Sequence, residues 1–417
     1  MTDDANSKAA GNAAPGRSGK ALEGIKVVEL GQLIAGPFAG KFFAEFGAEV
    51  IKIEPPSVEG KGGGDPLRSW RKLHNGTSLW WYVQNRNKKS VTVNLRDAQG
   101  QEIVRRLVRD ADIVIENFRP GTMEKWGLGY DDLARDNPGL VMLRLSGFGQ
   151  SGPQREQAGF GSIGESMGGL RYVTGFPDRP PVRPNLSIGD AIASLHGVIG
   201  AMMALESRRR TGRGQVVDVA LYEAVFNMME SMLPDFDMYG EVRERTGSNL
   251  TGIVPSNTYL SRDGKHIVIG ANGDSIFKRL MQLMGRPDLG DDPSLADNAG
   301  RVLRMTELDD AIGAWTAQHD AEELLRMLDG AQVPNSKIYS ITDIVADPQF
   351  IAREMIRQIS LPDGQKLRVP GIVPKLSHTP GELEWVGPAL GEHTEAVLAA
   401  HGYDAAQIAA LRGRGVV

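Results

Sequence analysis

A carboxylate stands at the start of a long apolar run. Asp190 precedes residues 191–205, in which Ser194 and His196 are the polar interruptions. This pattern predicts a helix that leaves no face for water and is therefore buried. Free backbone N–H groups and the positive end of the helix dipole would stabilise an ionised carboxylate at the first turn. Two interpretations fit Asp190, a helix N-cap and a carboxylate nucleophile.

The composition excludes several kinds of chemistry. The chain has 417 residues, a net charge of -5 and no cysteine. Without cysteine it has no disulfide, thiolate zinc site, iron–sulfur cluster or thiol nucleophile. Its seven histidines are scattered singly, which disfavours a histidine-built metal site. The net negative charge does not favour binding to nucleic acid. We therefore expect a metal-free cytoplasmic enzyme without a nucleic-acid partner.

Neither a membrane span nor a signal peptide is predicted. Every apolar run is broken by Gly, Ser, His or charge before it reaches the roughly 18 to 20 residues of a span. Residues 1–20 are mostly small or polar and contain no apolar core, which predicts a disordered tail.

The N-terminal half has the pattern of an α/β fold. Residues 25–30 read as a strand, residues 38–46 as a helix and residues 49–53 as a second strand. This βαβ unit predicts a parallel sheet. Further strands are predicted at residues 91–95, 112–115, 140–145 and 215–220. Polar residues at the carboxyl ends of such strands line the binding crevice. Residues 116–121, which follow the strand at 112–115, are therefore candidates for this crevice.

A dinucleotide site is not predicted. The turn after the first strand, residues 31–37 (GQLIAGP), lacks the G-x-G-x-x-G fingerprint. Two later matches, at residues 147–152 and 159–164, lack the strand-turn-helix context and are interpreted as glycine loops. A dehydrogenase is therefore disfavoured.

The remaining segments predict a second domain. A turn at Asp263-Gly264 between two β-prone runs predicts a hairpin, and helical patterns follow it. We predict a large domain at residues 21–206, a linker at 207–255, a small α+β domain at 256–345 and a return segment at 346–417. The cationic stretch at residues 85–90 is either a solvated loop or a phosphate cradle.

An ordered set of motifs runs along the chain: residues 22–30 (LEGIKVVEL), 35–37 (AGP), 47–54 (GAEVIKIE), 64–68 (GDPLR), 85–90 (NRNKKS), 116–121 (ENFRPG), 146–153 (SGFGQSGP), 189–190 (GD), 211–215 (TGRGQ) and 390–394 (LGEHT). With this set the sequence resembles the class III CoA-transferases (CaiB/BaiF), the family of formyl-CoA transferase and carnitine CoA-transferase. The resemblance extends from residue 21 to residue 417.

The resemblance implies a fold and a mechanism. In this family two subunits interlock, and each has a Rossmann-like large domain, built from both chain ends, and a small domain. The acid matching Asp190 attacks an acyl-CoA thioester, giving an aspartyl anhydride and then an aspartyl-CoA thioester. An acceptor carboxylate then takes over the CoA. N-cap and nucleophile are thus compatible roles. The implied partners are an acyl-CoA, a small carboxylate and a second subunit, without a permanently bound cofactor.

The resemblance also implies a set of CoA contacts. Among them Arg96 and Lys125 supply the cations that phosphates need. The matching positions are Leu33, Val93, Arg96, Asn117, Phe118 and Lys125.

Departures from the oxalate-using members bear on the acceptor. Ile34 replaces their glutamine, Pro55 replaces a basic residue, and their tetraglycine loop has no counterpart at residues 252–256. The likeness is closer to the dicarboxylate branch, such as succinyl-CoA:glutarate CoA-transferase, through residues 85–90, 182–184 and 253–255. The resemblance therefore predicts succinyl-CoA as donor and a dicarboxylic acid as acceptor.

The remote carboxylate of a dicarboxylic acid needs a cationic partner in an enclosed site. Arginine is well suited, because its guanidinium can bind a carboxylate through two hydrogen bonds. Arg68 and Arg183 are the candidates, although either could instead pair with a neighbouring acid.

Two alternative functions also fit the sequence. An α-methylacyl-CoA racemase-like enzyme would place a histidine where this chain has Phe160, so one proton-transfer partner is missing. The other alternative is a non-catalytic acyl-CoA-binding protein, which the presence of Asp190 disfavours.

Overall fold

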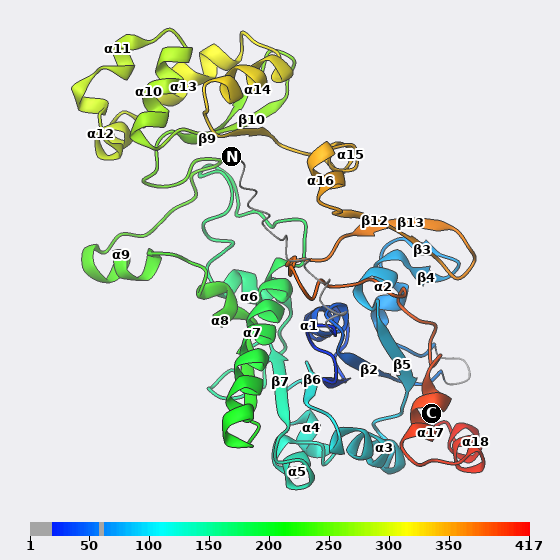
Figure 1. Ribbon diagram of the computed structural model, residues 1–417. Coiled ribbons are helices and arrows are strands. Elements are labelled where there is room, and N and C mark those ends of the chain that lie inside the picture. The colour runs from blue at the N-terminus through cyan, green and yellow to red at the C-terminus, as the bar shows by residue number, and fades with distance from the viewer. Residues whose placement is uncertain (1–18, 58–61) are drawn as a thin grey trace, which may run out of the picture. The chain divides into compact units, whose positions relative to one another are not determined.

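The computed structural model describes residues 19–57 and 62–417, and the chain divides into two compact units (Figure 1). Unit 1 takes both ends of the chain and comprises residues up to 160, residues 190–221 and residues 357–417. Unit 2 comprises residues 161–189 and 222–356. Most of the predicted tail, residues 1–18, lies outside the described residues.

Unit 1 is built on a six-stranded, wholly parallel sheet with the order β5-β2-β1-β6-β7-β8. Its strands are β1 (Lys26–Glu29), β2 (Glu49–Glu54), β5 (Lys88–Thr92), β6 (Ile113–Glu116), β7 (Val141–Ser146) and β8 (Val216–Ala220). The predicted parallel α/β architecture is confirmed. β5 begins three residues before the predicted start at residue 91, because buried Lys88 and Ser90 belong to the strand.

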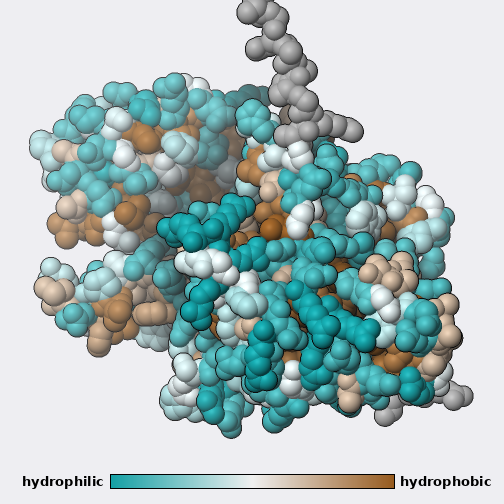
Figure 2. Space-filling view, turned by 60° about the horizontal axis from the view of Figure 1, so that its bottom comes forward, coloured by the Kyte–Doolittle hydropathy of each residue, from teal (hydrophilic) through white to brown (hydrophobic). Residues whose placement is uncertain are grey.

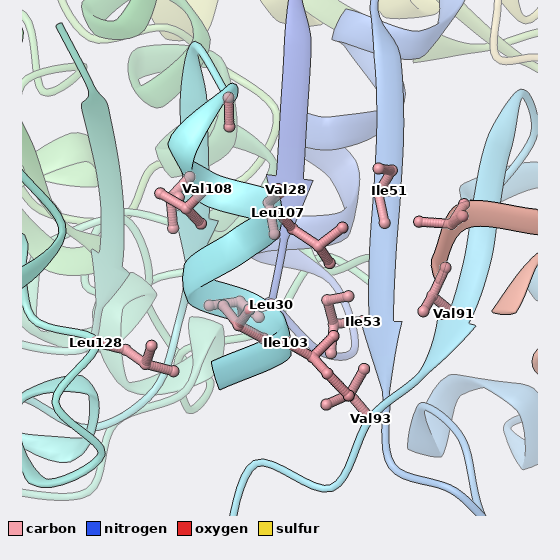
Figure 3. Packing of buried hydrophobic residues seen from close by; sticks show 14 of the residues in the cluster. Val28, Leu30, Ile51, Ile53, Val91, Val93, Ile103, Leu107, Val108 and Leu128 are labelled. Atoms are coloured by element: carbon pink, nitrogen blue, oxygen red, sulfur yellow. The ribbon is translucent and has the colours of Figure 1, made fainter. Parts of the chain in front are cut away.

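Helices cover the sheet, so its central strands are buried on both faces and read as continuous apolar runs. In α3 (Ala98–Arg109), apolar residues recur one turn apart. Figure 3 shows Ile103 and Leu107 of α3 lying against Val28 and Ile53 of the sheet.

The end of the chain returns to the edge strand β5. Helices α17 (Thr394–Ala400) and α18 (Ala405–Gly413) add apolar side chains to the core of unit 1. The Thr394 hydroxyl accepts a hydrogen bond from the Thr92 N–H at 2.9 Å. This return places the final segment in the same unit as β1.

The long helix α7 (Ile188–Thr211) packs on the sheet through small residues. A Cβ at Gly200 would lie 2.6 Å from Val217 Cγ1 of β8, so only glycine permits this approach. The predicted burial is wrong for the opposite face, which exposes large apolar side chains. They are Leu195, Ile199, Met202 and Met203. By length and composition α7 could also span a membrane, a test that core helices of soluble proteins pass as well.

The predicted domain boundaries need two corrections. Residues 207–255 are not a linker, because they contain β8, the sixth strand of the sheet, and the helices α8 (Leu221–Phe226) and α9 (Met232–Tyr239). Residues 161–189, expected in the large domain, belong to unit 2 with α6 (Gly161–Met167). Hydrophobic periodicity located β8, but it located neither α6 nor the unit that each segment joins.

Unit 2 contains a three-stranded antiparallel sheet with the order β11-β10-β9. Its strands are β9 (Ser256–Leu260), β10 (His266–Gly270) and β11 (Asn335–Lys337). The predicted hairpin is confirmed, with Gly264 at φ 74° in the turn and His266 paired with Leu260. The helices α10 (Asp274–Leu283), α11 (Pro287–Gly290), α12 (Asn298–Leu303), α13 (Met305–Thr316), α14 (Ala321–Gly330), α15 (Ile341–Ile344) and α16 (Pro348–Ala352) follow, with the 3-10 turn η2 (Pro293–Leu295).

The remaining elements of unit 1 are short. They are α1 (Ala35–Glu45), the 3-10 turn η1 (Pro66–Ser69), α2 (Leu79–Gln84), α4 (Thr122–Lys125), α5 (Tyr130–Asp136), the hairpin of β3 (Leu73–His74) with β4 (Thr77–Ser78), and the hairpin of β12 (Ile356–Ser360) with β13 (Lys366–Pro370). The surface seen in Figure 2 is mainly hydrophilic, with hydrophobic residues gathered in several places.

Candidate active site

The strand order of unit 1 reverses between β1 and β6. On one side of this point β2 and β5 follow β1, and on the other β7 and β8 follow β6. Open parallel sheets bind ligands at the carboxyl ends of the strands where the order reverses. The loops that leave β1 and β6 here are residues 30–34 and 117–121. Three of the predicted CoA contacts lie in these two loops.

Asn117 joins the two loops. Its side-chain NH2 donates to the Gln32 carbonyl at 2.9 Å, and its side-chain oxygen accepts from the Gln32 N–H at 2.8 Å. The ring of Phe118 meets Trp126 edge-on, with centroids 5.2 Å apart. The structure therefore brings Asn117, Phe118 and the loop of Leu33 together at the reversal point.

The other predicted CoA contacts are placed differently. Arg96, between β5 and α3, and Lys125, the last residue of α4, are exposed to solvent, as cations that meet phosphates would be. The side chain of Val93 is 1% exposed within the hydrophobic core. Val93 therefore contributes packing below the loops rather than a side-chain surface for a ligand.

Glu116 ends β6 beside these loops and is fully buried. Its carboxylate accepts from the Phe118 N–H and from Arg144 Nε, both at 2.7 Å. Burial raises the pKa of the Glu116 carboxyl to about 6, against the opposing charge of Arg144.

We expect Glu116 to make folding stability depend on pH. Its folded pKa lies above the ordinary 4.5, so the folded protein binds this proton more tightly than the unfolded chain does. The resulting stabilisation, at most about 2 kcal/mol, is complete below about pH 4.5 and is lost as the pH rises through about 6. Denaturant unfolding gives the free energy of unfolding of wild type and of Glu116→Gln. The wild-type value should fall relative to that of the variant as the pH rises across this range. A difference that stays flat with pH would contradict the assignment.

Asp190 is the third residue of α7, which begins at Ile188. It is therefore not the N-cap, and the N-cap interpretation is corrected. It still lies in the first turn, where free N–H groups and the helix dipole favour an ionised carboxylate. One turn later, the Ser194 hydroxyl lies 2.7 Å from both the Asp190 carbonyl and the Ala35 carbonyl. This hydroxyl links the helix of Asp190 to the end of the β1 loop.

Gly189, immediately before Asp190, allows a close approach that a side chain would prevent. A Cβ there would lie 2.7 Å from the Gly161 carbonyl oxygen of α6. The Gly189 N–H donates to Glu165 Oε1 at 3.3 Å, and Glu165 is fully buried. Within unit 2, α6 thus fixes the residue that leads into Asp190.

The same carboxylate holds two arginines. Arg171 Nη2 lies 2.9 Å and Arg183 Nε 3.4 Å from Glu165 Oε2. The side chain of Arg183 remains 45% exposed. Sequence reasoning missed Glu165 and Arg171, because a single acid and a single arginine in short segments form no distinguishing pattern.

Arg68 is already engaged by a neighbouring acid. Its Nε and Nη2 donate to the two oxygens of Glu54 at 2.7 and 2.8 Å. The guanidinium also stacks on Trp81, 3.6 Å from the ring centroid. These contacts favour a structural role for Arg68 and leave Arg183 as the stronger candidate for a substrate carboxylate.

The cationic stretch at residues 85–90 is neither a solvated loop nor a phosphate cradle. Arg86 Nε donates to Glu45 Oε1 at 2.6 Å, and Lys88 Nζ lies 2.7 Å from Glu29 Oε2. Both cations are buried inside unit 1. Their carboxylate partners come from other elements, which the local pattern could not reveal.

The two glycine segments, residues 147–152 and 159–164, have a steric role, and the second is not a loop throughout because α6 begins at Gly161. A Cβ at Gly147 would lie 2.7 Å from the Cα of Gly159, so the two segments cross where neither can carry a side chain. Within residues 19–57 and 62–417, no three His, Asp or Glu side chains gather in a way that could hold a metal ion.

Comparison with known proteins identifies the family. The sequence profile of CoA-transferase family III matches residues 22–394. The chain is 51% identical over 382 residues to the "Succinyl-CoA--D-citramalate CoA-transferase" of Chloroflexus aurantiacus, covering 91% of this chain and 94% of that protein. It is 33% identical to the "Succinate--glutarate CoA-transferase" of Agrobacterium fabrum, covering 91% and 95%.

The fold comparison agrees. A crystal structure of a CAIB/BAIF family protein from Brucella suis superposes with a TM-score of 0.79 and 34% identity, covering 92% of this chain and all of that one. The predicted family is therefore confirmed, and this chain belongs to CoA-transferase family III.

Proposed function

We propose that this protein moves CoA from succinyl-CoA to a second dicarboxylic acid, with Asp190 as the nucleophile. The observation that carries the proposal is the 51% identity, over nine-tenths of the chain, with an enzyme named for succinyl-CoA and D-citramalate. Asp190, in the first turn of α7, supplies the carboxylate that the chemistry requires.

The reaction runs through four acyl transfers. The Asp190 carboxylate attacks the succinyl thioester and expels CoA thiolate, forming a mixed anhydride. The thiolate attacks the aspartyl carbonyl, which releases succinate and leaves an aspartyl-CoA thioester. The acceptor carboxylate attacks this thioester and expels the thiolate again. The thiolate then attacks the acceptor carbonyl of the new anhydride, which yields acceptor-CoA and free Asp190. No proton or electron is gained or lost overall.

Arg183 and the names of the relatives support a dicarboxylic acid as the acceptor. Their names specify D-citramalate, L-malate and glutarate, all dicarboxylates. Arg183 lies seven residues before Asp190 in the sequence and is anchored at Nε by Glu165. We assign the remaining donors of its guanidinium to the second carboxylate, because an unpaired charge is costly in an enclosed site. Succinyl-CoA carries the same group, so one arginine serves donor and acceptor in turn.

A direct assay tests the proposal. Purified protein is incubated with succinyl-CoA and, separately, with citramalate, malate, glutarate and matched monocarboxylates. CoA esters are then identified by mass spectrometry. We expect new esters from one or more dicarboxylates, together with release of succinate. Hydrolysis alone, or transfer confined to monocarboxylates, would overturn the proposal.

The racemase alternative is disfavoured at the site itself. Where a histidine would accept or donate a proton, this chain has Phe160, whose side chain cannot do either and is 66% exposed. Incubation of a single enantiomer of a 2-methylacyl-CoA should leave its configuration unchanged.

We propose further that the protein is a homodimer with interlocked subunits, as the family resemblance implies. The exposed stripe of α7 supports this assembly, because its large apolar side chains recur every three or four residues on one helix face. They are Leu195, Ile199, Met202 and Met203. Contiguous apolar surface of this kind is typical of an interface between protein chains.

Replacing Ile199 by aspartate is expected to disrupt the dimer. The substitution places a charge in the centre of the stripe, where a second copy would have to desolvate it. Light scattering should give twice the chain mass for wild type and a smaller or aggregated species for Ile199→Asp. Arg209→Asp, at an exposed polar position of the same helix, is the matched control and should remain dimeric.

Interlocking has its own test. Tagged and untagged wild-type dimers should fail to form mixed dimers without unfolding. A monomeric wild type, or rapid exchange of native subunits, would contradict this assembly.

A further inference from the structure

The loop between β1 and α1, residues 30–34, is held by buried charges that the transfer reaction does not use. We call Glu29, Lys52, Asp65 and Lys88 the charge cluster; each of these residues is at most 2% exposed. Lys52 Nζ lies 2.9 Å from both Glu29 Oε1 and Asp65 Oδ2. Lys88 Nζ lies 2.7 Å from Glu29 Oε2, an ion pair rather than a directed hydrogen bond.

Stability is a weak explanation for this arrangement. Removing charges from water is expensive, and apolar side chains of similar volume often stabilise a fold equally well or better. Buried ion pairs do, however, fix geometry, because each partner has few alternative positions once its charge is desolvated.

The charge cluster holds the loop at two backbone positions, Gly31 and Leu33. Lys52 Nζ donates to the Gly31 carbonyl at 2.8 Å. The two Asp65 oxygens accept from the Leu33 N–H at 3.0 and 3.1 Å. Leu33 has φ 62°, a left-handed conformation that is unfavourable for a leucine. Such strain persists only where surrounding contacts enforce it, and it is common at ligand clamps.

The same loop adjoins two parts of the active site. Gln32 exchanges two hydrogen bonds with the side chain of Asn117, a predicted CoA contact. The carbonyl of Ala35, directly after the loop, lies 2.7 Å from the Ser194 hydroxyl, which also contacts the Asp190 carbonyl. A change in the loop would therefore be felt both at the reversal point of the sheet and at the helix of Asp190.

We propose that Asp65 is a positioning residue, which together with Lys52 holds residues 30–34 in the conformation that receives the CoA moiety. The proposal deepens the proposed function and rests on it. Asp65 acts through the loop backbone and does not itself touch the substrate.

The test compares two substitutions that remove a buried carboxylate from unit 1. Asp65→Asn keeps the size of the side chain but loses the ion pair with Lys52. Glu45→Gln is the matched control, because Glu45 is 2% exposed and pairs with buried Arg86. None of the interactions described for Glu45 reaches residues 30–34.

We expect both variants to unfold at lower denaturant concentration than wild type. In calorimetric titration of folded protein with CoA, Asp65→Asn should bind about tenfold or more weakly, because the loop must then be ordered by the ligand. Glu45→Gln should bind within about twofold of wild type, since no loop contact is lost. Equal affinities for Asp65→Asn and Glu45→Gln would overturn the proposal.

Hydrogen exchange of the wild type keeps the proposal testable if Asp65→Asn does not fold. The N–H groups of Gln32 and Leu33 should exchange slowly without CoA and change little when CoA is added. Fast exchange that slows only with CoA would mean that the ligand, not the charge cluster, orders the loop. A wild type that does not bind CoA would contradict the proposed function instead.

Discussion

Asp190→Ala is expected to fold normally and to lose CoA transfer by at least about a thousandfold, the scale of loss when a nucleophile is removed. Only a carboxylate can form the anhydride and the aspartyl thioester, so Asp190→Asn should be nearly as inactive. Asp190 is the third residue of α7 and not its N-cap. Its removal forfeits a charge–dipole interaction of about 0.3–1 kcal/mol in the first turn of the helix.

The measurement is steady-state turnover of succinyl-CoA with the best acceptor, alongside thermal unfolding of both variants. Melting temperatures close to wild type establish that lost activity is a chemical effect. If either folded variant retained more than about a thousandth of wild-type turnover, Asp190 would not be the nucleophile.

Arg183→Ala is expected to reduce kcat/KM for a dicarboxylate acceptor by roughly thirty- to a hundredfold, corresponding to about 2–3 kcal/mol for a lost charge-assisted contact. A monocarboxylate of equal length should be affected little, because it has no second carboxylate to pair. The Nε contact with Glu165 pre-orients Arg183 for this purpose, which limits the ordering cost on binding.

Arg68→Ala is the informative comparison. Its guanidinium is bound by both oxygens of Glu54 and stacked on Trp81. This variant should lose stability, since Glu54 is left buried without its partner, and should keep the ratio of dicarboxylate to monocarboxylate kcat/KM. Equal losses on both acceptor classes in Arg183→Ala would remove Arg183 from acceptor recognition.

The sequence predicted the sheet well because parallel strands covered on both faces read as short apolar runs. All six strands of the sheet in unit 1 overlap predicted runs. The same reasoning assigned residues 207–255 to a linker, although β8 completes the sheet beside β7. Periodicity identifies a strand, but the neighbour with which it pairs depends on contacts far apart in the chain.

Long-range contacts also explain what was missed at the site. Glu165 accepts a hydrogen bond from the N–H of Gly189, which is 24 positions later in the chain. Lys88 of β5 forms an ion pair with Glu29 of β1. Local charge patterns do not encode such partners. The burial of α7 was overestimated for a related reason. An apolar helix face predicts that the face is covered, but it does not tell whether the same chain or a second chain covers it.

The most direct test of the proposed mechanism is to detect CoA covalently bound to Asp190. The enzyme is mixed with succinyl-CoA without acceptor, quenched in acid and digested, and the peptides are sequenced by mass spectrometry. We predict that the peptide containing Asp190 gains the mass of CoA less one water, that the adduct disappears when acceptor is added before quenching, and that Asp190→Asn never forms it. Transfer that proceeds with no adduct, or with an adduct on a different residue, would contradict the central claim.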